Sequence, residues 1–317
     1  MLNAFSLLAL TAVTLLTAQP AAAQSKPGSN QVVRIGYQKY GTLVVLKASG
    51  ALEKRLAGSG VEVRWTEFPA GPQLLEGLNV GSIDFGTTGE APPIFAQAAG
   101  ADLLYVGYEP PAPGGEAIVV PKGSALKSVS ELKGKKIALN KGSNVHYLLV
   151  KLLEKSGLAY KDVELVFLPP ADARAAFERG SVDAWVIWDP FLAAAEKQLG
   201  ARVLADGKGV VSNHQFYLAA RNYTQKNPEV IRQIIDELAR SDDWSQKNLK
   251  ATASLLSTQV GLEPAIVELA AQRFAYGVKP LSEAVIKEQQ AIADSFAELK
   301  LLPKRIVVRD AVYQPKQ

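Results

Sequence analysis

A four-residue motif occurs twice in this chain, as Gly81-Ser82-Ile83-Asp84 and as Gly180-Ser181-Val182-Asp183. In both copies a segment with helical spacing precedes the motif, a short apolar strand follows it, and another helix then begins at proline. Two units with the same order of elements predict two lobes. Because ligands of α/β sheets bind outside the carboxyl ends of the strands, we expect the binding site between the lobes.

The segments before the first copy alternate between strand and helix. Residues 32–37 and 61–68 have the composition of strands, whereas residues 43–56 and 73–80 have helical spacing. A short polar connection links each strand to the helix after it. This order is typical of an α/β fold with a parallel sheet, in which the polar connections gather at one edge.

Two extended segments, near Ile118 and near Tyr217, are predicted to carry the chain from one lobe to the other and back. Extended crossings can bend through small dihedral changes, so we interpret them as a hinge. From Pro228 onward the spacing is mostly helical, which predicts a cover added to the first lobe. The predicted organisation is a signal peptide at residues 1–23, lobe 1 at 30–117 and 219–317, and lobe 2 at 118–218.

The N-terminus has the pattern of a secretory signal. Residues 4–18 are an apolar run, and Ala21-Ala22-Ala23 supplies small residues for cleavage before Gln24. The Lys or Arg that normally precedes such a run is absent. A membrane anchor is the alternative, but spanning a bilayer takes about 20 apolar residues and this run is shorter. We therefore predict export to the periplasm.

The chain lacks the common catalytic motifs. It has no cysteine, which excludes disulfides, thiolate metal sites, cysteine nucleophiles and a lipoprotein anchor. A Gly-x-Ser-x-Gly elbow, a P-loop and a His-Glu-x-x-His helix are also missing. The net charge of +4 is spread along the chain with no basic stripe, so nucleic-acid binding is not predicted. We predict no catalytic residue, no cofactor and no metal.

The two histidines, His146 and His214, are far apart and have no carboxylate at metal-ligand spacing. We interpret His214 as a solvated loop residue. His146 begins a predicted helix at a polar connection, so a position facing the site is as good an interpretation as a purely structural one.

The strongest candidate for an anion site is Lys141-Gly142-Ser143-Asn144, which lies directly between a predicted strand and a predicted helix. Ser and Asn are preferred helix caps, which gives a purely structural interpretation. The free N–H groups and the dipole at a helix N-terminus also bind anions. Thr87-Thr88-Gly89 offers the same chemistry from the other lobe.

Aromatic and acidic residues follow the second copy of the motif. Trp185 and Trp188 are predicted to lie on different faces, so one belongs to the core and the other can face the cleft. Glu90 and Asp189 occupy equivalent places after the two strands. As helix caps they need no further function, and as site residues they would bind a cationic group rather than an anion.

Further segments carry a resemblance to a known family, over residues 32–315. They are Tyr37-Gln38-Lys39, Glu67-Phe68-Pro69-Ala70-Gly71-Pro72-Gln73, Leu78-Asn79-Val80-Gly81-Ser82-Ile83-Asp84, Pro92-Pro93-Ile94-Phe95-Ala96-Gln97-Ala98-Ala99-Gly100-Ala101-Asp102, Pro170-Ala171-Asp172-Ala173-Arg174-Ala175-Ala176-Phe177, Val182-Asp183-Ala184-Trp185 and Ile187-Trp188-Asp189-Pro190. With these segments the chain resembles the aliphatic sulfonate-binding proteins of bacterial ABC importers.

The resemblance implies a two-lobed type II periplasmic-binding-protein fold with the ligand cleft between the lobes. It also implies delivery of alkanesulfonates to an inner-membrane permease and its ATPase for sulfur acquisition, and we expect a monomer. We expect the ligand tail to contact Trp188 and Phe216. Carried over position by position, the ligand contacts fall at Gln38, Lys39, Thr87, Thr88, Gly89, Gly142, Ser143, Asn144, Trp188 and Asp189.

Other functions fit parts of the sequence. A taurine, nitrate or pyrimidine-like ligand could bind the same fold, with Glu90 and Asp189 as partners for the ammonium of taurine. An enzyme on this architecture, such as a deaminase or a thiamine-precursor synthase, is disfavoured by the missing cysteine and the few histidines. The effector domain of a cytoplasmic regulator would need an N-terminal DNA-binding helix pair, and the sequence shows none.

Overall fold

The structure is a computed structural model, and it describes residues 31–314. The predicted signal peptide, residues 1–23, lies outside the described residues. The strands are β1 (Gln31–Tyr37), β2 (Val61–Glu67), β3 (Phe85–Gly89), β4 (Leu103–Tyr108), β5 (Glu116–Val120), β6 (Lys136–Leu139), β7 (Glu164–Phe167), β8 (Ala184–Trp188), β9 (Arg202–Asp206) and β10 (Gln215–Ala220). The helices are α1 (Gly41–Ser49), α2 (Ala51–Ala57), α3 (Gly71–Asn79), α4 (Ala91–Ala98), α5 (Asn144–Lys155), α6 (Pro170–Glu178), α7 (Phe191–Gln198), α8 (Arg221–Lys226), α9 (Pro228–Lys247), α10 (Leu249–Val260), α11 (Pro264–Ala271) and α12 (Glu283–Glu298).

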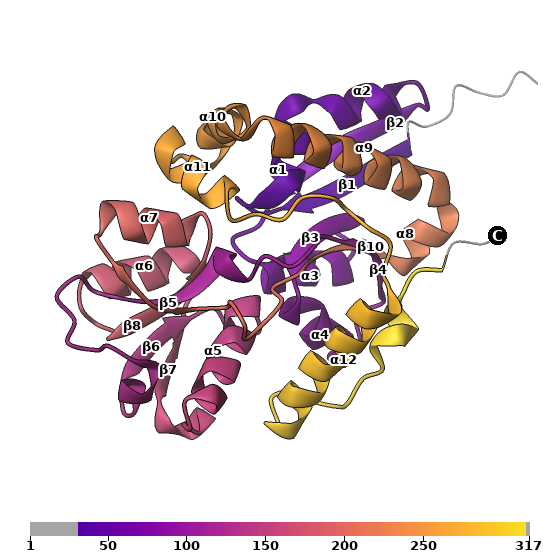
Figure 1. Cartoon of the computed structure of the whole chain (residues 1–317). Coiled ribbons are helices and arrows are strands. Elements are labelled where there is room, and N and C mark those ends of the chain that lie inside the picture. Colours follow the sequence, from indigo (N-terminus) through magenta and orange to yellow (C-terminus); the bar gives the residue numbers. More distant parts are fainter. Residues whose placement is uncertain (1–30, 315–317) are drawn as a thin grey trace, which may run out of the picture.

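The strands form two five-stranded sheets, with the orders β2-β1-β3-β10-β4 and β7-β6-β8-β5-β9. Figure 1 shows the two sheets side by side, each with helices packed against it. This arrangement confirms the predicted α/β class. Among residues 31–314 no helix combines the length and the apolar character that crossing a membrane requires.

One strand in each sheet runs against the predicted parallel arrangement. β10 is antiparallel to both β3 and β4, and β5 is antiparallel to both β8 and β9. The other pairs, such as β1 with β3 and β6 with β8, are parallel. The parallel arrangement predicted from the segments before the first motif is confirmed by the pairing of β1 with β2, and each sheet adds one antiparallel strand to it. β5 and β10 are the strands by which the chain enters each sheet from the other one, and they run in the opposite direction.

Two linkers connect the sheets. Residues 109–115 lead from β4 to β5, and residues 207–214 lead from β9 back to β10. The segments near Ile118 and Tyr217, which the sequence suggested as the crossings, are paired strands inside the two sheets. The linkers themselves lie a few residues earlier in the chain.

The repeated motif has the same structural role in both sheets. The Asp84 carboxylate accepts a hydrogen bond from the Arg34 backbone N–H at 2.9 Å, and the Asp84 N–H donates to the Arg34 carbonyl at 2.7 Å. Asp183 makes the same two bonds with Lys136, both at 2.8 Å. Each motif therefore attaches the start of one strand, β3 or β8, to its parallel neighbour, at the middle of β1 or at the start of β6.

Each sheet is packed around a core made mainly of its own residues. In the first sheet Ile35 and Phe85 are fully buried, together with Ile234 of α9. In the second sheet Trp185 is buried beside Phe177 of α6, with ring centroids 5.9 Å apart. Burial of such a side chain contributes about 1.5–3 kcal/mol relative to exposure.

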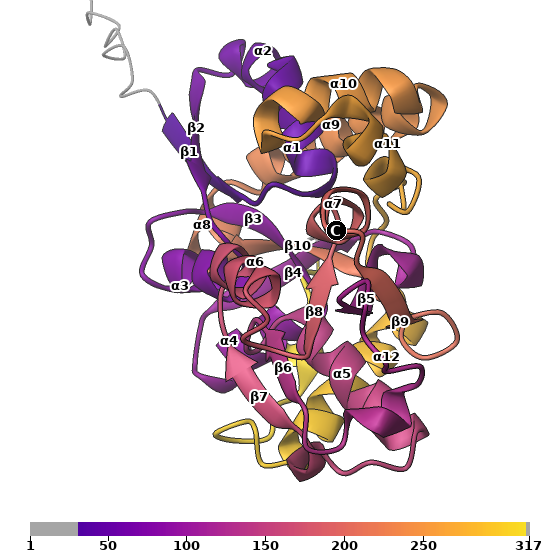
Figure 2. The same cartoon turned by 90° about the vertical axis from the view of Figure 1, so that its left-hand side faces the viewer.

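The C-terminal segment is mostly helical, as predicted, but its helices do not all cover the first sheet. α9 packs on α1 and α2, and α10 packs on α1. α11 instead contacts α7 of the second sheet, where Ile266 and Ala270 lie against Ala193 and Ala194 (Figures 1 and 2). The predicted cover of lobe 1 therefore also reaches across to the other sheet.

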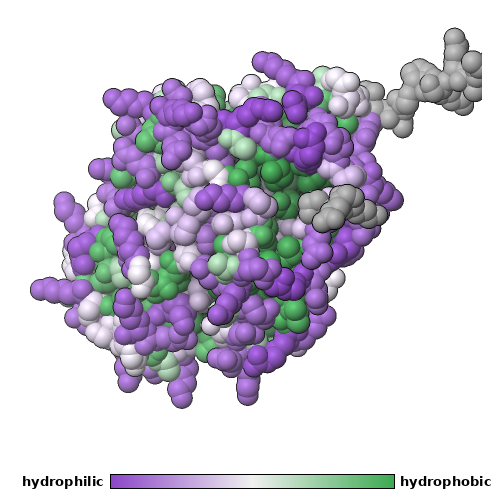
Figure 3. Space-filling view, turned by 45° about the vertical axis from the view of Figure 1, so that its right-hand side comes forward, coloured by the Kyte–Doolittle hydropathy of each residue, from purple (hydrophilic) through white to green (hydrophobic). Residues whose placement is uncertain are grey.

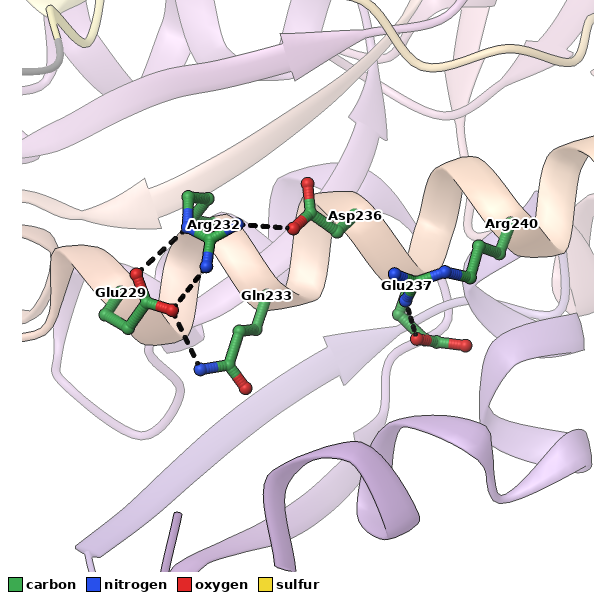
Figure 4. A network of polar contacts seen from close by, with 6 residues as sticks. All are labelled: Glu229, Arg232, Gln233, Asp236, Glu237 and Arg240. Carbon is green, nitrogen blue, oxygen red and sulfur yellow. Dashed lines mark hydrogen bonds and ion pairs between the residues drawn. The ribbon is translucent and has the colours of Figure 1, made fainter. Parts of the chain in front are cut away.

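One face of the molecule carries both hydrophilic and hydrophobic side chains (Figure 3). Figure 3 shows this face, with hydrophilic side chains around its rim and hydrophobic residues in separate patches toward its middle. The exposed side of α9 carries a row of ion pairs and hydrogen bonds (Figure 4), formed by Glu229, Arg232, Gln233, Asp236, Glu237 and Arg240. Such exposed pairs contribute little to stability.

Candidate functional site

A small cavity lies where the two sheets meet. Its volume of about 10 Å³ has room for about one water molecule. The residues that line it come from strand ends and helix starts of both lobes and from the second linker: Gln38, Tyr40, Gly71, Gly89, Pro92, Ser143, Asn144, Trp188, Asn213 and Gln215. Five of the ten residues predicted as ligand contacts, Gln38, Gly89, Ser143, Asn144 and Trp188, are among them.

Four helices begin at this cavity. Tyr40 precedes α1, Gly71 begins α3, Pro92 lies in the first turn of α4 and Ser143 precedes α5. No side chain at the four N-cap positions makes a capping hydrogen bond. The backbone N–H groups of these first turns are therefore not satisfied by their own caps, and the positive ends of four helix dipoles meet at one place. Such an arrangement favours an anion.

The two lobes are in contact at Gly89. A Cβ atom at this position would lie 2.9 Å from the side chain of Asn144, so only glycine fits there. Asn144 is held in place because its Nδ2 group donates to Glu116 Oε2 and, at 3.1 Å, to Asn213 Oδ1. Asn213 in turn donates to the Ala112 carbonyl at 2.8 Å. The contact between the sheets thus depends on a small amide network that includes both linkers.

The hydroxyl groups of the two predicted threonines, Thr87 and Thr88, donate hydrogen bonds to backbone carbonyls of the protein. Thr87 Oγ1 donates to the Phe216 carbonyl at 3.1 Å, and Thr88 Oγ1 donates to the Gly89 carbonyl at 2.9 Å. Gln38 Nε2 donates to the Thr87 carbonyl at 2.9 Å. The threonine side chains are buried and do not line the cavity, whereas Gln38 does. Phe216, expected to contact a ligand tail, is fully buried in the core, so that expectation was wrong.

Lys39, Gly142 and His146 also lie away from the cavity lining. Lys39 is partly exposed, with Nζ 3.7 Å from a Glu67 carboxylate oxygen. The Gly142 N–H donates to His146 Nδ1 at 3.2 Å, which leaves the imidazole proton on Nε2, 2.6 Å from Tyr160 Oη. Burial lowers the pKa of His146 to about 4, so the ring is neutral and has a structural role.

Asp189 contacts both α7 of its own lobe and Arg273 of the C-terminal segment. Its Oδ1 accepts a hydrogen bond from the Ala193 N–H of α7 at 3.0 Å. Its Oδ2 lies 3.5 Å from Arg273 Nη1, and Arg273 Nη2 lies 2.7 Å from Glu196. Burial raises the pKa of Asp189 to about 7, against the lowering effect of Arg273. This carboxylate caps a helix, which was one of its two predicted roles.

Glu90 occupies the N-cap position of α4 but does not cap it. The side chain turns instead to the second linker, where Oε2 accepts the His214 N–H at 3.1 Å. Oε1 has no hydrogen-bond partner among the described residues. Burial is the main cause that raises the pKa of Glu90 to about 8, so the group is mostly protonated at neutral pH. A neutral carboxyl does not repel an anion bound nearby.

Sequence reasoning did not identify the polar residues of the second linker, or the buried acid Glu116, as neighbours of the site. His214, expected to be a solvated loop residue, is 4% exposed and its Nδ1 donates to the Glu109 carbonyl at 2.8 Å, so that expectation was wrong. Glu116 is fully buried, and burial raises its pKa well above the usual range. The run Asn213-His214-Gln215 is the sequence signal that could have found them. These three polar residues lie where the chain crosses between the sheets, and all three line a cavity. No cluster of metal-ligating side chains occurs among residues 31–314.

Comparisons with known proteins agree with an anion site. The NMT1-like family matches residues 25–258. The putative aliphatic sulfonates-binding protein of Escherichia coli K12 is 45% identical over 312 residues, 98% of this chain and 96% of that protein. The protein of the same description from Bacillus subtilis 168 is 33% identical over 282 residues, 88% of this chain and 85% of that protein.

A solved structure shows the same fold. The alkanesulfonate-binding protein from Xanthomonas axonopodis pv. citri, bound to MOPS, has a TM-score of 0.86 and 46% identity. The match covers 91% of this chain and all of that one. This similarity confirms the predicted two-lobed binding-protein fold.

Proposed function

Because this chain belongs to the NMT1-like family, among its aliphatic sulfonate-binding members, we propose that it captures alkanesulfonates between its two lobes for import. The observation that carries the proposal is the meeting of four uncapped helix N-termini at one cavity between the sheets. The sulfonate head binds there, with Gln38, Ser143 and Asn144 beside it.

The chemistry of the head group suits this cavity. A sulfonate stays anionic at physiological pH, so it accepts hydrogen bonds and donates none. Backbone N–H groups at helix N-termini supply donors without adding a mobile charge. Each charge-assisted bond contributes about 1.5–3 kcal/mol net. Glu90 and Glu116 do not oppose binding because burial favours their neutral forms.

Binding requires the lobes to open and close. The cavity has room for about one water molecule, and a sulfonate group is larger. The ligand therefore enters with the lobes apart, and residues 109–115 and 207–214 act as the hinge. We place the lobe boundaries at these linkers, a few residues before those suggested by the sequence. The alkyl tail lies against Trp188 and Tyr40, the aromatic residues of the cavity.

The remaining roles follow from the same proposal. The similar proteins are named as binding proteins, and a solved Escherichia coli relative, 45% identical to this chain, is named as periplasmic. We propose that this chain is likewise exported, that it acts as a monomer without catalysis or a cofactor, and that it delivers its ligand to a permease and its ATPase.

Thermal unfolding with a panel of ligands tests the proposal. Alkanesulfonates of one to eight carbons, sulfate and nitrate are each added at about 100 times the Kd, in a buffer that contains no sulfonate. A ligand that binds only the folded protein adds about 2.7 kcal/mol at this concentration, which raises the Tm by about 5 °C for a chain of this size. Stabilisation by nitrate or sulfate, with none by alkanesulfonates, would contradict the proposal.

Closure is tested at Gly89, where a Cβ atom would meet Asn144 at 2.9 Å. Gly89→Ala should hold the lobes apart and raise the Kd for alkanesulfonates by about tenfold or more, or about 1.4 kcal/mol. Gly58→Ala is the matched control, because a Cβ atom at Gly58 meets nothing within 4 Å. Equal affinities in the two variants would show that this contact has no part in binding.

A further inference from the structure

His146, in the first turn of α5, lies in an apolar contact between the two lobes. Its side chain is fully buried, and its ring centroid lies 6.3 Å from that of Phe95 in α4 and 5.5 Å from that of Phe296 in α12. Both phenylalanines pack in the core of the first lobe. Because His146 belongs to the second lobe, part of the surface that buries its ring comes from the other lobe.

The residues on either side of His146 take part in the same contact. The Tyr147 ring centroid lies 5.8 Å from that of Phe296. A Cβ atom at Gly142 would lie 3.5 Å from the ring of Phe95, so the loop before α5 also meets the first lobe. The start of α5 therefore rests on α4 and α12, and these helices move away from it when the lobes open.

Other neighbours of His146 belong to its own lobe and stay beside it when the lobes open. The ring centroid of Phe167, at the end of β7, lies 5.7 Å away, and Tyr160 Oη lies 2.6 Å from Nε2. Lys141 is the cation whose charge acts on the ring. Opening thus removes the neighbours supplied by the first lobe and exposes one side of the imidazole to water.

The hydrogen bonds of the closed structure require a neutral imidazole. Nδ1 accepts the Gly142 N–H at 3.2 Å, so a second proton on the ring would place one N–H group opposite another. The charged ring would also be held away from water against two phenylalanines, and the nearby charge of Lys141 would repel it. Protonation of His146 therefore opposes the contact between the lobes.

We propose that His146 is a positioning residue that couples capture of the sulfonate to release of a proton. Its neutral ring holds the loop at the start of α5 and forms part of the surface on which the first lobe closes, so protonation favours the open lobes and weakens binding. The inference rests on the proposed function, because it needs closure around a ligand beside Ser143 and Asn144, which line the small cavity.

The pKa of His146 gives the direction of the effect. Burial, and to a smaller extent Lys141, lowers it to about 4 in the closed structure. With the lobes apart the ring meets water, so its pKa moves toward about 6.5, the value of an exposed histidine. Between these values the open protein holds a proton that the closed protein lacks. Closure is therefore weakened, and the Kd rises, as the pH falls.

The other groups that face the ring keep their charge over this range. Burial raises the pKa of Tyr160 to about 12, so its hydroxyl stays protonated. The groups that α4 and α12 present to His146, Phe95 and Phe296, are uncharged. A change in affinity between pH 5.5 and pH 7.5 that depends on this contact is therefore assigned to the imidazole.

Calorimetric titration with butanesulfonate, in buffers that contain no sulfonate, tests the inference. The Kd of the natural protein should rise by about three- to tenfold from pH 7.5 to pH 5.5. His146→Asn keeps an acceptor for the Gly142 N–H, and His146→Phe keeps an aromatic ring in the contact. Neither side chain titrates, so in both variants the Kd should change by less than about twofold over this range.

A purely structural role would give a different result. Loss of structure alone would raise the Kd by the same factor at every pH and would leave its pH dependence as it is in the natural protein. Unfolding curves establish that each variant is folded. If both variants keep the full rise in Kd, another group causes it and the inference is wrong.

Two further variants test whether the effect passes between the lobes. Phe95→Ala, in the first lobe, lets water reach His146 in the closed state, so it should reduce the rise in Kd to about twofold. Phe167→Ala is the matched control, because Phe167 lies beside the ring but belongs to the same lobe, and it should leave the rise unchanged. Equal reductions in the two variants would contradict coupling between the lobes.

Proton NMR of the untagged protein follows the ring directly. The chain has two histidines, so loss of one set of imidazole signals in His146→Asn assigns the set of His146. Without ligand these signals should titrate near pH 6, and with saturating butanesulfonate they should stay those of a neutral ring down to about pH 5. Equal midpoints with and without ligand would overturn the inference, although the proposed function would stand if butanesulfonate binds. If butanesulfonate binds at no pH, the proposed function itself fails.

Discussion

The two copies of the repeated motif begin alike and end differently. In both, the aspartate makes two backbone hydrogen bonds that attach one strand to its parallel neighbour. Beyond the strand, the first copy ends in Glu90 and the second in Asp189. Asp189 Oδ1 accepts a hydrogen bond from α7, and its Oδ2 lies 3.5 Å from Arg273 Nη1 without a hydrogen bond. Glu90 Oε1 has neither a hydrogen bond nor an ion pair among the described residues.

The comparison separates scaffold from site. The shared Gly-Ser-(Ile/Val)-Asp sequence sets where each strand starts, and none of its residues lines the cavity between the sheets. The acids after the two strands have different roles. Asp189 binds the N-terminus of α7, whereas the Glu90 carboxyl lines a cavity. Equivalent positions in a repeat therefore have the same backbone role without having the same chemistry.

The largest expected effect concerns the aspartates of the motif. Asp84 is nearly buried and also binds the guanidinium of Arg34, with Nη2 2.6 Å from Oδ1, whereas Asp183 has only backbone partners. Asp84→Ala leaves the Arg34 backbone N–H without its acceptor and removes the charge-assisted bond to the partly exposed guanidinium, so it should lower the free energy of unfolding by about 1.5–3 kcal/mol. Asp183→Ala should cost about 1 kcal/mol. Urea unfolding of both variants measures the difference, and equal losses would mean that Arg34 adds nothing.

The next largest effect is the change of stability with pH that Glu90 and Asp189 cause. Glu90 has a folded-state pKa of about 8, against about 4.3 in an unfolded chain. Between these values the folded state keeps a proton that the unfolded state has released, so stability falls as pH rises, by a few kcal/mol at most. Glu90→Gln should remove part of this decline up to about pH 8.

Asp189→Asn provides the comparison. The folded-state pKa of Asp189 is about 7, against about 3.9 unfolded, so its contribution to the decline ends earlier. Between about pH 7 and about pH 8 only Glu90→Gln should still differ in slope from the natural protein. Unfolding free energies measured across this range test whether the pKa of Glu90 lies above that of Asp189. Identical slopes in both variants would mean that the two carboxyls do not differ in pKa as their burial and pairing predict.

Much of the fold was predictable because local patterns decide it. The segments from Pro228 onward have strong helical periodicity, and a short apolar run follows each motif; the structure has helices and strands in these places. A predicted helix over residues 43–56 is instead two helices, because Gly50 adopts a left-handed conformation with φ of 62° between them. The antiparallel strands β5 and β10 were not predictable, since direction depends on how the chain crosses between sheets.

The site was only partly predictable for a related reason. Helix N-termini can be found from the sequence, and Ser143 and Asn144 were found in this way. The packing of one lobe against the other decides which of these N-termini meet. It also decides which hydroxyl groups form hydrogen bonds within the protein. The buried acids were missed because nothing local distinguishes Glu116 from an exposed strand residue.

The smallest expected effect is on the surface of α9, where acids are paired but exposed. Arg232 binds Glu229 and Asp236 there (Figure 4), and the hydrogen bond from Arg232 lowers the pKa of Glu229 to about 2, opposite in direction to the shift of Glu90. Because water screens fully exposed charges and the side chains lose freedom on pairing, Arg232→Ala should leave the urea midpoint within experimental scatter at neutral pH. If Arg232→Ala lowered the free energy of unfolding as much as Asp84→Ala, burial would not explain why some ion pairs of this protein stabilise it more than others.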